Sequence, residues 1–362
     1  HGWREAVDEC LSQVTVSLNT GNLGFIYTTD SFSDQMDLIV QRFRDQTNVK
    51  NWVGSTGVGI LRSGREEYEN SAMNIMIGTF PENSFKVFSG VSGQLQNFTE
   101  NFNSWLENNL QTFSVIHVDP QTQNLRRLIP EFADILQEGY LIGALSSAHG
   151  HTIQIANGTQ SAGISGVMFS EDVPVSTGVT QGCSPIGPQR TITNVSENII
   201  FAIDDRPALE VFKEDIGEEL ASDLGRLVGN VFAALPLVGS DTGDYLVRNI
   251  VGVDPQHNLI AIGDNVEVGN PIFFCQRDKN TAEKDLIRML QVMRRRIKDT
   301  MPRGALYFSC LGRGRHTFGD ESSEMMIIRR ELGDLPLVGF FANGEISHRS
   351  LYTYTGVLAV FL

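Results

Sequence analysis

The chain has 362 residues, of which 41% are hydrophobic and 20% charged, and its formal net charge is −15 at pH 7. This composition excludes disordered, collagen-like and coiled-coil proteins, and the acidic balance argues against a nucleic-acid partner, because phosphate binding needs concentrated Lys and Arg. No apolar run reaches the roughly 18 residues that a membrane helix needs, so we expect no membrane insertion. The length predicts two domains or one duplicated unit.

Apolar residues recur with helical spacing in several parts of the chain. Ser33 is a candidate N-cap for one of these helices, Pro130 is expected in the first turn of another that stops at Gly139, and Asn280 with Glu283 forms a start that resembles a capping box. The predicted helices cover residues 3–14, 36–43, 98–106, 129–138 and 280–297, with strands between them.

The order of predicted elements is nearly the same over residues 72–170 and 245–362, which indicates an internal duplication. An apolar strand with a glycine near its end occurs in each copy, at Gly143 and Gly339, and a third time at Gly54. Such a glycine lets the backbone approach a ligand closely and would form the rim of a shared pocket. Ordinary packing between a helix and a strand explains each glycine equally well.

A turn-rich segment at residues 177–188 marks the predicted division of the chain. We expect an N-terminal module at 1–200 and a C-terminal module at 201–362, both built from mixed sheets flanked by helices in an α/β fold. Two packed sheets and a layered α-β-β-α stack fit the pattern equally well. Because the passage around residues 185–205 is short and apolar, we expect the modules to pack together and leave a cleft, where ligands commonly bind.

The segment 304–316 is the most informative for chemistry, because an apolar strand ends in Cys310 and a turn with two arginines follows. The backbone N–H groups of Gly312 and Gly314, with the guanidinium groups of Arg313 and Arg315, predict a site for a carboxylate or phosphate. A tight turn whose arginines pair with surface carboxylates is the alternative. The spacing matches neither a dinucleotide fingerprint nor a P-loop.

Cys310 is the candidate nucleophile of the sequence, and the arginines beside it predict a lowered thiol pKa. Catalysis would also need a positioned base, and His316 is the nearest candidate in sequence. We therefore expect no catalytic residue and treat Cys310 as an inert or ligand-lining thiol.

The segment 340–346 combines aromatic, amide and carboxylate side chains at a strand end. Phe341 and Asn343 could line a pocket there, and Glu345 could receive an ammonium group. Asn343 and Gly344 also form the strongest hairpin-turn signal in the chain, which explains both residues without a ligand.

No metal or cofactor is expected. His149, His151 and the pair His117 and Asp119 offer imidazoles and a carboxylate, but nothing supplies a third ligand for any of these sets. Cys10, Cys183, Cys275 and Cys310 lie far apart without CxxC spacing, and residue 1 begins no signal segment. We therefore expect reduced thiols and a cytoplasmic location.

Two groups of motifs in this chain resemble the FIST family, named for F-box and intracellular signal transduction proteins. The C-terminal module carries the resemblance at 308–314 and 336–346, and the N-terminal module carries it at 52–60, 65–69 and 181–188. The resemblance implies a bacterial or eukaryotic sensory module that binds small ligands such as amino acids and acts on a signalling partner protein. Ser55 and Ser184 stand where the family pattern often has Cys and Arg, which indicates a different ligand if those positions touch it.

The residues and the resemblance favour a sensory protein that binds an amino-acid-like or other anionic metabolite in the cleft between its modules. Arg313 and Arg315 would bind the carboxylate, and Glu345 with Asn343 would bind the amine. The expected ligand-binding residues are Cys310, Gly312, Arg313, Gly314, Arg315, Phe341, Asn343, Glu345, Gly54, Ser55 and Thr56. A thiol-dependent enzyme or redox sensor using Cys310 and an interaction scaffold without a ligand remain the alternatives.

Overall fold

The computed structural model describes residues 2–14, 20–68, 71–93, 95–221, 229–237, 244–298, 300–319 and 322–362. The chain forms two compact units, one from His1–Gln181 with Glu283–Leu362 and one from Gly182–Ala282. The fold is mixed α/β, as expected from the sequence. No helix in the described part of the chain is long and apolar enough to cross a membrane.

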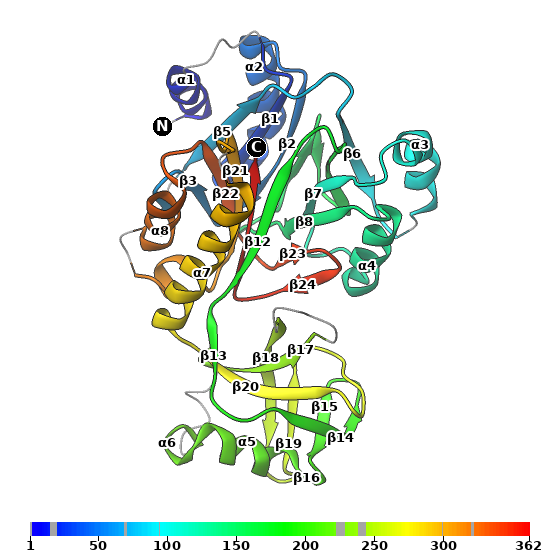
Figure 1. Ribbon diagram of the computed structural model, residues 1–362, viewed down its shortest axis with the longest axis vertical. Coiled ribbons are helices and arrows are strands. Elements are labelled where there is room, and N and C mark those ends of the chain that lie inside the picture. Colours follow the sequence, from blue (N-terminus) through cyan, green and yellow to red (C-terminus); the bar gives the residue numbers. More distant parts are fainter. Residues whose placement is uncertain are drawn as a thin grey trace. The chain divides into compact units, whose positions relative to one another are not determined.

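The larger unit contains three sheets with helices on their outer sides (Figure 1). Its helices lie near the positions that the apolar periodicity predicts. Their bounds are α1 Trp3–Gln13, α2 Met36–Thr47, α3 Gln96–Glu107, α4 Leu125–Ile135, α7 Lys279–Ile297, of which the part from Glu283 belongs to this unit, and α8 Ser323–Leu332. One expectation was wrong: α4 begins four residues early, so Pro130 lies inside the helix and not in its first turn.

The first sheet has the strand order β10-β9-β2-β1-β5, the second β24-β23-β8-β7-β11-β6 and the third β12-β25-β21-β22-β3-β4. The strands of the first half of the chain are β1 Leu23–Thr29, β2 Asn51–Gly57, β3 Gly59–Arg62, β4 Arg65–Tyr68, β5 Met73–Gly78, β6 Phe85–Val91, β7 Phe113–Val118, β8 Tyr140–Leu145, β9 Gln154–Ala156, β10 Thr159–Gln160, β11 Ile164–Phe169 and β12 Val175–Gln181. Those of the second half are β21 Gly304–Cys310, β22 Leu337–Ala342, β23 Glu345–Ser347, β24 Ser350–Tyr352 and β25 Thr355–Phe361.

The three sheets repeat one pattern. Each contains a parallel pair joined by a helix, namely β1 and β2, β7 and β8, and β21 and β22. An antiparallel strand flanks the first member of each pair, and an antiparallel two-stranded hairpin flanks the second. The part of the predicted duplication that relates β7–β11 to β21–β25 is therefore present, with the strand at Gly54 belonging to a third copy.

The repeats exchange their hairpins. The β3–β4 hairpin follows β2 in the chain but pairs with β22, the β9–β10 hairpin follows β8 but pairs with β2, and the β23–β24 hairpin follows β22 but pairs with β8. Each sheet is therefore completed by a segment that comes from another repeat.

The three glycines occupy the same place in this pattern. Gly54 is paired with Ile26, Gly143 with Ile116 and Gly339 with Tyr307, each across the parallel pair of its own sheet. A Cβ at any of these glycines would overlap the carbonyl oxygen of its partner. Close approach of two strands thus explains the repeated glycine, and no ligand is needed for it.

The residues that follow these partners meet at the centre of the larger unit. Tyr27, His117 and Phe308 contact one another edge to face, with ring centroids 5.5, 5.9 and 6.0 Å apart. The Tyr27 hydroxyl lies 3.0 Å from Nε2 of His117, and burial lowers the pKa of His117 to about 3. A neutral imidazole is therefore part of the hydrophobic core that the three sheets share.

The smaller unit is a sheet that closes on itself. Its strand order is β13-β20-β14-β15-β19-β18-β17, and β17 pairs back onto β20, while β16 extends β15 and α5 packs on the core. The bounds are β13 Cys183–Pro185, β14 Arg190–Ser196, β15 Ile199–Ile203, β16 Arg206–Pro207, α5 Ala208–Ile216, α6 Glu218–Ala221, β17 Val231–Pro236, β18 Tyr245–Asp254, β19 Leu259–Ile262 and β20 Pro271–Arg277. The strands at 245–277 belong to this unit, so the prediction that they repeat the start of 72–170 was wrong.

The hairpin predicted at Asn343 and Gly344 is also absent. β22 before it and β23 after it belong to different sheets, because β23 leaves to pair with β8. The turn therefore passes the chain from the third sheet to the second, and a local turn signal cannot distinguish this exchange from a hairpin.

We expect Gly143→Ala to lower the free energy of unfolding by about 1–3 kcal/mol, because its Cβ would push β8 away from β7. Gly158→Ala is the matched control, since nothing lies within 4 Å of a Cβ there, and its effect should stay within about 0.5 kcal/mol. Chemical denaturation followed by circular dichroism measures both. Equal stability of the two variants would contradict the packing role assigned to the glycine.

Candidate functional site

The predicted anion loop lies between β21 and α8 in the third sheet. All seven residues of β21 are buried, and the chain then makes a short 3-10 helix at Gly314–His316 before α8 begins at Ser323. Gly314 has φ 49° and lies against Phe341 and the Tyr68 hydroxyl, so a side chain there would be strained and would clash. This turn directs Arg313 inward.

A buried carboxylate that sequence reasoning did not identify organises the loop. Glu324, on α8, is 0% exposed. Its two oxygens accept hydrogen bonds from the Tyr307 hydroxyl at 2.6 Å, the Ser309 hydroxyl at 2.9 Å, Nε of Arg313 at 2.8 Å and the backbone N–H of Gly314 at 3.1 Å. The carboxylate therefore holds the end of β21, the turn and the start of α8 together.

Arg313 is 1% exposed, and its charge is matched inside the protein. Nη2 lies 2.7 Å from Oε1 of Glu324, and the guanidinium group lies over the ring of Phe318. Burial opposes the charge, but the nearby carboxylate more than offsets it, so the pKa of Arg313 is raised. Neither Nη1 nor Nη2 has an aligned hydrogen-bond partner among the described residues.

Glu345 is the second buried carboxyl group near this arginine. It is 0% exposed, and Oε2 accepts hydrogen bonds from the hydroxyl of Thr355 at 2.7 Å and its backbone N–H at 3.3 Å. Oε1 has no partner among the described residues. Burial raises the pKa of Glu345 to about 8, although Thr355 and Arg313 both favour the ionised form. The carboxyl group is therefore mostly protonated at pH 7.

Cys310 lies in the same cluster, but its chemistry differs from the expectation. The residue is 7% exposed, and burial, followed by repulsion from Glu345 once that carboxyl group is ionised, raises its thiol pKa. The prediction of a lowered pKa was wrong, because Arg313 is neutralised by Glu324 and has only a small effect on the thiol. His316, the candidate base, is exposed.

The exchanged β3–β4 hairpin covers this cluster. Tyr68 stacks on Phe341 with ring centroids 4.7 Å apart, and the guanidinium group of Arg315 lies 4.6 Å from the Tyr68 ring. The Tyr68 hydroxyl donates to Glu66 at 2.9 Å and accepts the backbone N–H of Arg315 at 3.1 Å. Burial, and then repulsion from Glu324, raises the pKa of Glu66 to about 7.

The structure brings some of the predicted site residues together and places others elsewhere. Cys310, Arg313, Gly314, Phe341 and Glu345 belong to the buried cluster, and Arg315 lies at its edge. Asn343 is exposed in the turn between two sheets. The remaining members are Gly312, against Tyr354, and Gly54, Ser55 and Thr56 in β2.

The hydroxyl groups of Ser55 and Thr56 in β2 have hydrogen-bond partners outside the Arg313 cluster. Ser55 lies 2.7 Å from the Ser146 hydroxyl, and the Thr56 hydroxyl accepts the backbone N–H of Ile153 at 3.0 Å. Both side chains are buried. Within the described residues no group of three or more His, Cys, Asp or Glu side chains is arranged to hold a metal ion.

The fold and this cluster define a class of protein: an α/β module with three exchanged sheets and a buried, charged side-chain cluster where its N-terminal and C-terminal segments meet. The FIST N domain matches residues 22–206 and the FIST C domain matches residues 208–348. The chain belongs to the FIST family, whose domains are associated with sensing in signal transduction.

Curated relatives are similar to about half of this chain. An uncharacterized protein of Mycobacterium tuberculosis strain CDC 1551 / Oshkosh is 35% identical over 193 residues, which is 51% of this chain and 50% of that protein. An uncharacterized protein of Mycobacterium bovis is 35% identical over 199 residues, which is 52% of this chain and 50% of that protein. The chain spans about half the length of the curated relatives it matches.

We expect Arg313→Ala to lower the free energy of unfolding by about 3–5 kcal/mol, because Glu324 would remain buried without its cation. The double variant Arg313→Met with Glu324→Gln should recover part of this loss, since it leaves no buried charge. Arg329→Ala is the control, because that arginine pairs with Asp334 at the surface and should cost about 1 kcal/mol or less. Denaturation curves of the parent and these three variants test this, and a double variant no more stable than Arg313→Ala would contradict the pairing.

Glu345 should make stability depend on pH. Its pKa is raised from 4.5 to about 8, so the unfolded chain releases this proton at a pH where the folded protein still holds it. Stability from this group is fully present below pH 4.5 and falls, by up to about 1.4 kcal/mol per pH unit, until pH rises through about 8. Glu345→Gln should remove this contribution, so the stability difference between pH 5 and pH 8 becomes smaller than in the parent. An unchanged difference in denaturation experiments would contradict the raised pKa.

Proposed function

We propose that this protein is a sensory module that binds a small amino-acid-like metabolite between Arg313 and Glu345. One observation carries the proposal: two buried polar atoms of complementary character, Nη1 of Arg313 and Oε1 of Glu345, lack partners among the described residues. Buried polar groups are nearly always hydrogen-bonded, so such a pair is the expected mark of a small polar ligand. The ligand class also agrees with the sensing role of the family.

The ligand would bind by charge and hydrogen bonding. Its carboxylate would accept from Arg313, whose guanidinium group is ion-paired with Glu324. Its ammonium group would face Oε1 of Glu345 and favour the ionised carboxylate, so binding near pH 7 would release a proton from Glu345. A neutral or purely anionic metabolite would not produce this release.

The modules expected at 1–200 and 201–362 would both contribute to this site. The β3–β4 hairpin comes from the N-terminal module, and its Tyr68 stacks on Phe341 of the C-terminal module. Because Arg313 and Glu345 are almost fully buried, a ligand would have to displace this hairpin to enter. That displacement would be the conformational signal of binding, passed to a signalling partner protein.

The thiol-dependent alternative is less well supported, because Cys310 is buried with a raised pKa and its candidate base is exposed. A thiol in this state is a poor nucleophile. The scaffold alternative does not explain why these two buried atoms lack partners among the described residues. A ligand screen without a hit would favour it.

A thermal-shift screen against amino acids, organic acids and nucleotides tests the proposal. An amino acid present at about 100 times its dissociation constant should add about 2.7 kcal/mol of stability, which raises the melting temperature by several degrees. Arg313→Lys keeps a cation beside Glu324 but loses Nη1, and Glu345→Gln loses the titrating oxygen, so both should lose the shift. Arg329→Lys, at the surface, should keep it.

Calorimetry of a hit at pH 7 in phosphate and in Tris then measures the proton release. Different binding enthalpies in the two buffers are expected, because the released proton is taken up by buffers of different ionisation enthalpy. A hit that keeps its affinity in both Arg313→Lys and Glu345→Gln would place binding elsewhere. No shift with any compound would reject the sensory proposal in favour of the scaffold.

A further inference from the structure

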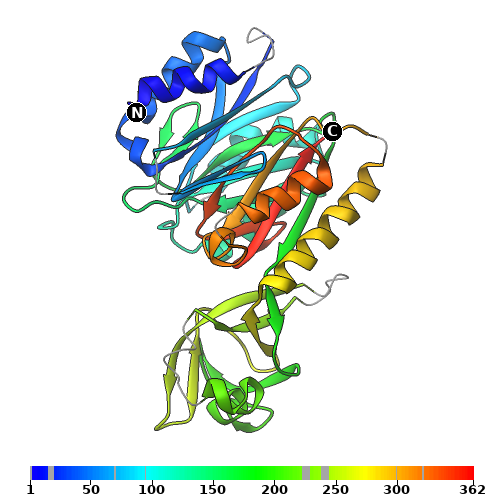
Figure 2. The same cartoon turned by 90° about the vertical axis from the view of Figure 1, so that its left-hand side faces the viewer.

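The smaller unit brings together two cysteines that are distant in the sequence. Cys183 begins β13 and Cys275 lies in β20, and the antiparallel register places Arg277 opposite Cys183 and Pro185 opposite Cys275. Side chains two residues apart in a strand share a face, so the two cysteine side chains are diagonal neighbours on one face of the sheet. The strands β13 and β20 run side by side in Figure 1 and, after a quarter turn, in Figure 2.

The two thiols contact each other inside the protein. Cys183 is 1% exposed and Cys275 is 0% exposed. Their side chains are hydrogen-bonded, and this bond, followed by burial, raises the pKa of Cys275. A hydrogen bond raises the pKa of the group that donates it, so the Cys275 thiol donates and the sulfur of Cys183 accepts. Both cysteines are free thiols in this structure, and their sulfur atoms lie next to each other.

The two strands differ in how far they can move. β20 pairs with β14 and β17 as well as with β13, so Cys275 is fixed within the sheet. β13 has three residues, and among the described strands it pairs with β20 alone. Cα atoms of diagonal neighbours lie about 7–8 Å apart, whereas a disulfide spans about 4.4–6.8 Å, so a bridge would draw β13 toward β20. A short edge strand can make this shift while the other strands keep their pairing.

We propose that Cys183 and Cys275 are a redox-active pair that hydrogen peroxide converts into a reversible disulfide. Peroxide transfers one oxygen to the sulfur of Cys183, which turns the thiol into a sulfenic acid and releases water. The sulfur of Cys275 then attacks the sulfenic sulfur, so that the S–S bond forms and a second water leaves. Two thiols lose two hydrogens in total, and one peroxide is reduced to two waters. Cys183 reacts first, because Cys275 keeps its proton in the hydrogen bond.

The position of the pair determines what its oxidation does. The smaller unit runs from Gly182 to Ala282, so Cys183 lies at its start and Cys275 close to its end. A disulfide would close nearly the whole unit into one covalent loop, which restricts the unfolded chain and stabilises the folded unit. Because β13 must shift to form it, this disulfide carries strain, and strained disulfides are reduced more readily than structural ones. Thiols of the glutathione class should therefore open it by exchange, and are themselves oxidised to their disulfide.

Peptide mapping of the full chain tests the proposal without any ligand of the Arg313 cluster. The folded protein is treated with millimolar hydrogen peroxide, its remaining thiols are alkylated in denaturant, and its peptides are identified by mass spectrometry. We expect one linked peptide pair that joins Cys183 to Cys275, and millimolar reduced glutathione should restore both thiols. Cys10→Ser is the control and should form the same link, because Cys10 lies on α1 and donates to Met73.

Single variants separate the two steps. Cys275→Ser should accumulate the sulfenic acid at Cys183, detected as an adduct with dimedone, whereas Cys183→Ser should leave Cys275 as a thiol. Hydrogen exchange reports the closure: the amide of Ser184, next to Cys183 in β13, should exchange at least tenfold more slowly after oxidation. The double variant Cys183→Ser with Cys275→Ser should show no such change with peroxide.

Three results would overturn the proposal. They are the absence of the linked peptide pair from the folded parent, its formation in denaturant alone, and a link that millimolar glutathione leaves intact. Mapping of the parent decides the first two even if the cysteine variants fail to fold. Because no step uses Arg313 or Glu345, these results are independent of the thermal-shift screen for a metabolite.

Discussion

The exchange of hairpins among the three repeats is the constraint on which the larger unit depends. A parallel strand pair with one covering helix leaves an apolar face and two open edges. Each repeat closes one of these edges with a hairpin from another repeat, and the three apolar faces meet around Tyr27, His117 and Phe308. All three repeats therefore contribute side chains to the central core. A strand displaced in one sheet would disturb the packing of the other two.

The charged cluster follows from the same exchange. The β21 strand end and α8 hold Arg313 against Glu324, but the cover over this pair is Tyr68, which the N-terminal hairpin delivers. Two buried carboxyl groups then compete for one buried cation. Glu324 has four hydrogen-bond donors and Glu345 has two, and burial raises the pKa of Glu345 so that it keeps its proton at pH 7. A protonated Glu345 beside a charged Arg313 is a polar site whose charge state responds to whatever binds there.

Local sequence signals predicted the local elements well. Apolar periodicity located the helices, and the glycines of three strands revealed the repeat, because both depend on residues close together in the chain. The exchange could not be predicted this way: Asn343 and Gly344 carry a hairpin signal although the strands beside them join different sheets. For the same reason the sequence marked 65–69 as a motif but did not place Glu66 and Tyr68 beside Arg313, because they are distant in the chain. It also missed Glu324, whose position on α8 has no marker apart from the apolar residues around it.

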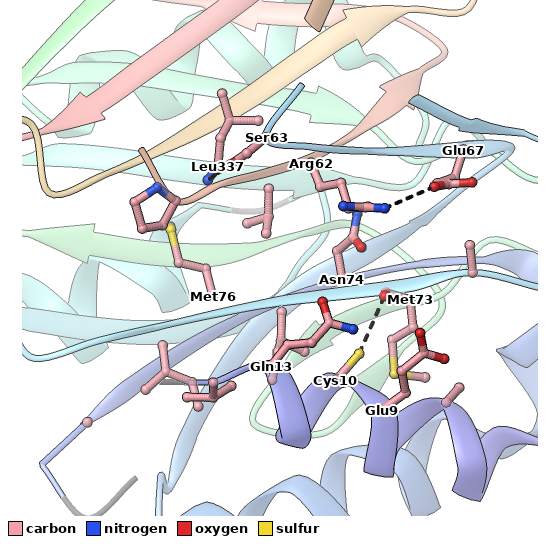
Figure 3. Close-up of a pocket in the computed structure, with 18 of the residues that line it drawn as sticks. Glu9, Cys10, Gln13, Arg62, Ser63, Glu67, Met73, Asn74, Met76 and Leu337 are labelled. Carbon is pink, nitrogen blue, oxygen red and sulfur yellow. Dashed lines mark hydrogen bonds and ion pairs between the residues drawn. The ribbon is translucent and has the colours of Figure 1, made fainter. Parts of the chain in front are cut away.

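The β3–β4 hairpin connects the charged cluster with the recess of about 490 Å³ beside β5 (Figure 3), because alternate side chains of β4 face in different directions. Glu66 and Tyr68 contact the charged cluster, whereas Glu67 lines the recess at β5 with its ion-pair partner Arg62. A ligand that displaces Tyr68 must therefore move Glu67 and change the wall of the recess. Coupling between two positions is reciprocal, so a molecule bound in the recess would change ligand affinity at the cluster by the same factor as the ligand changes affinity in the recess. A two-stranded hairpin held by one edge to β22 is the kind of element that can carry such coupling, since it can shift without unfolding the three central strand pairs.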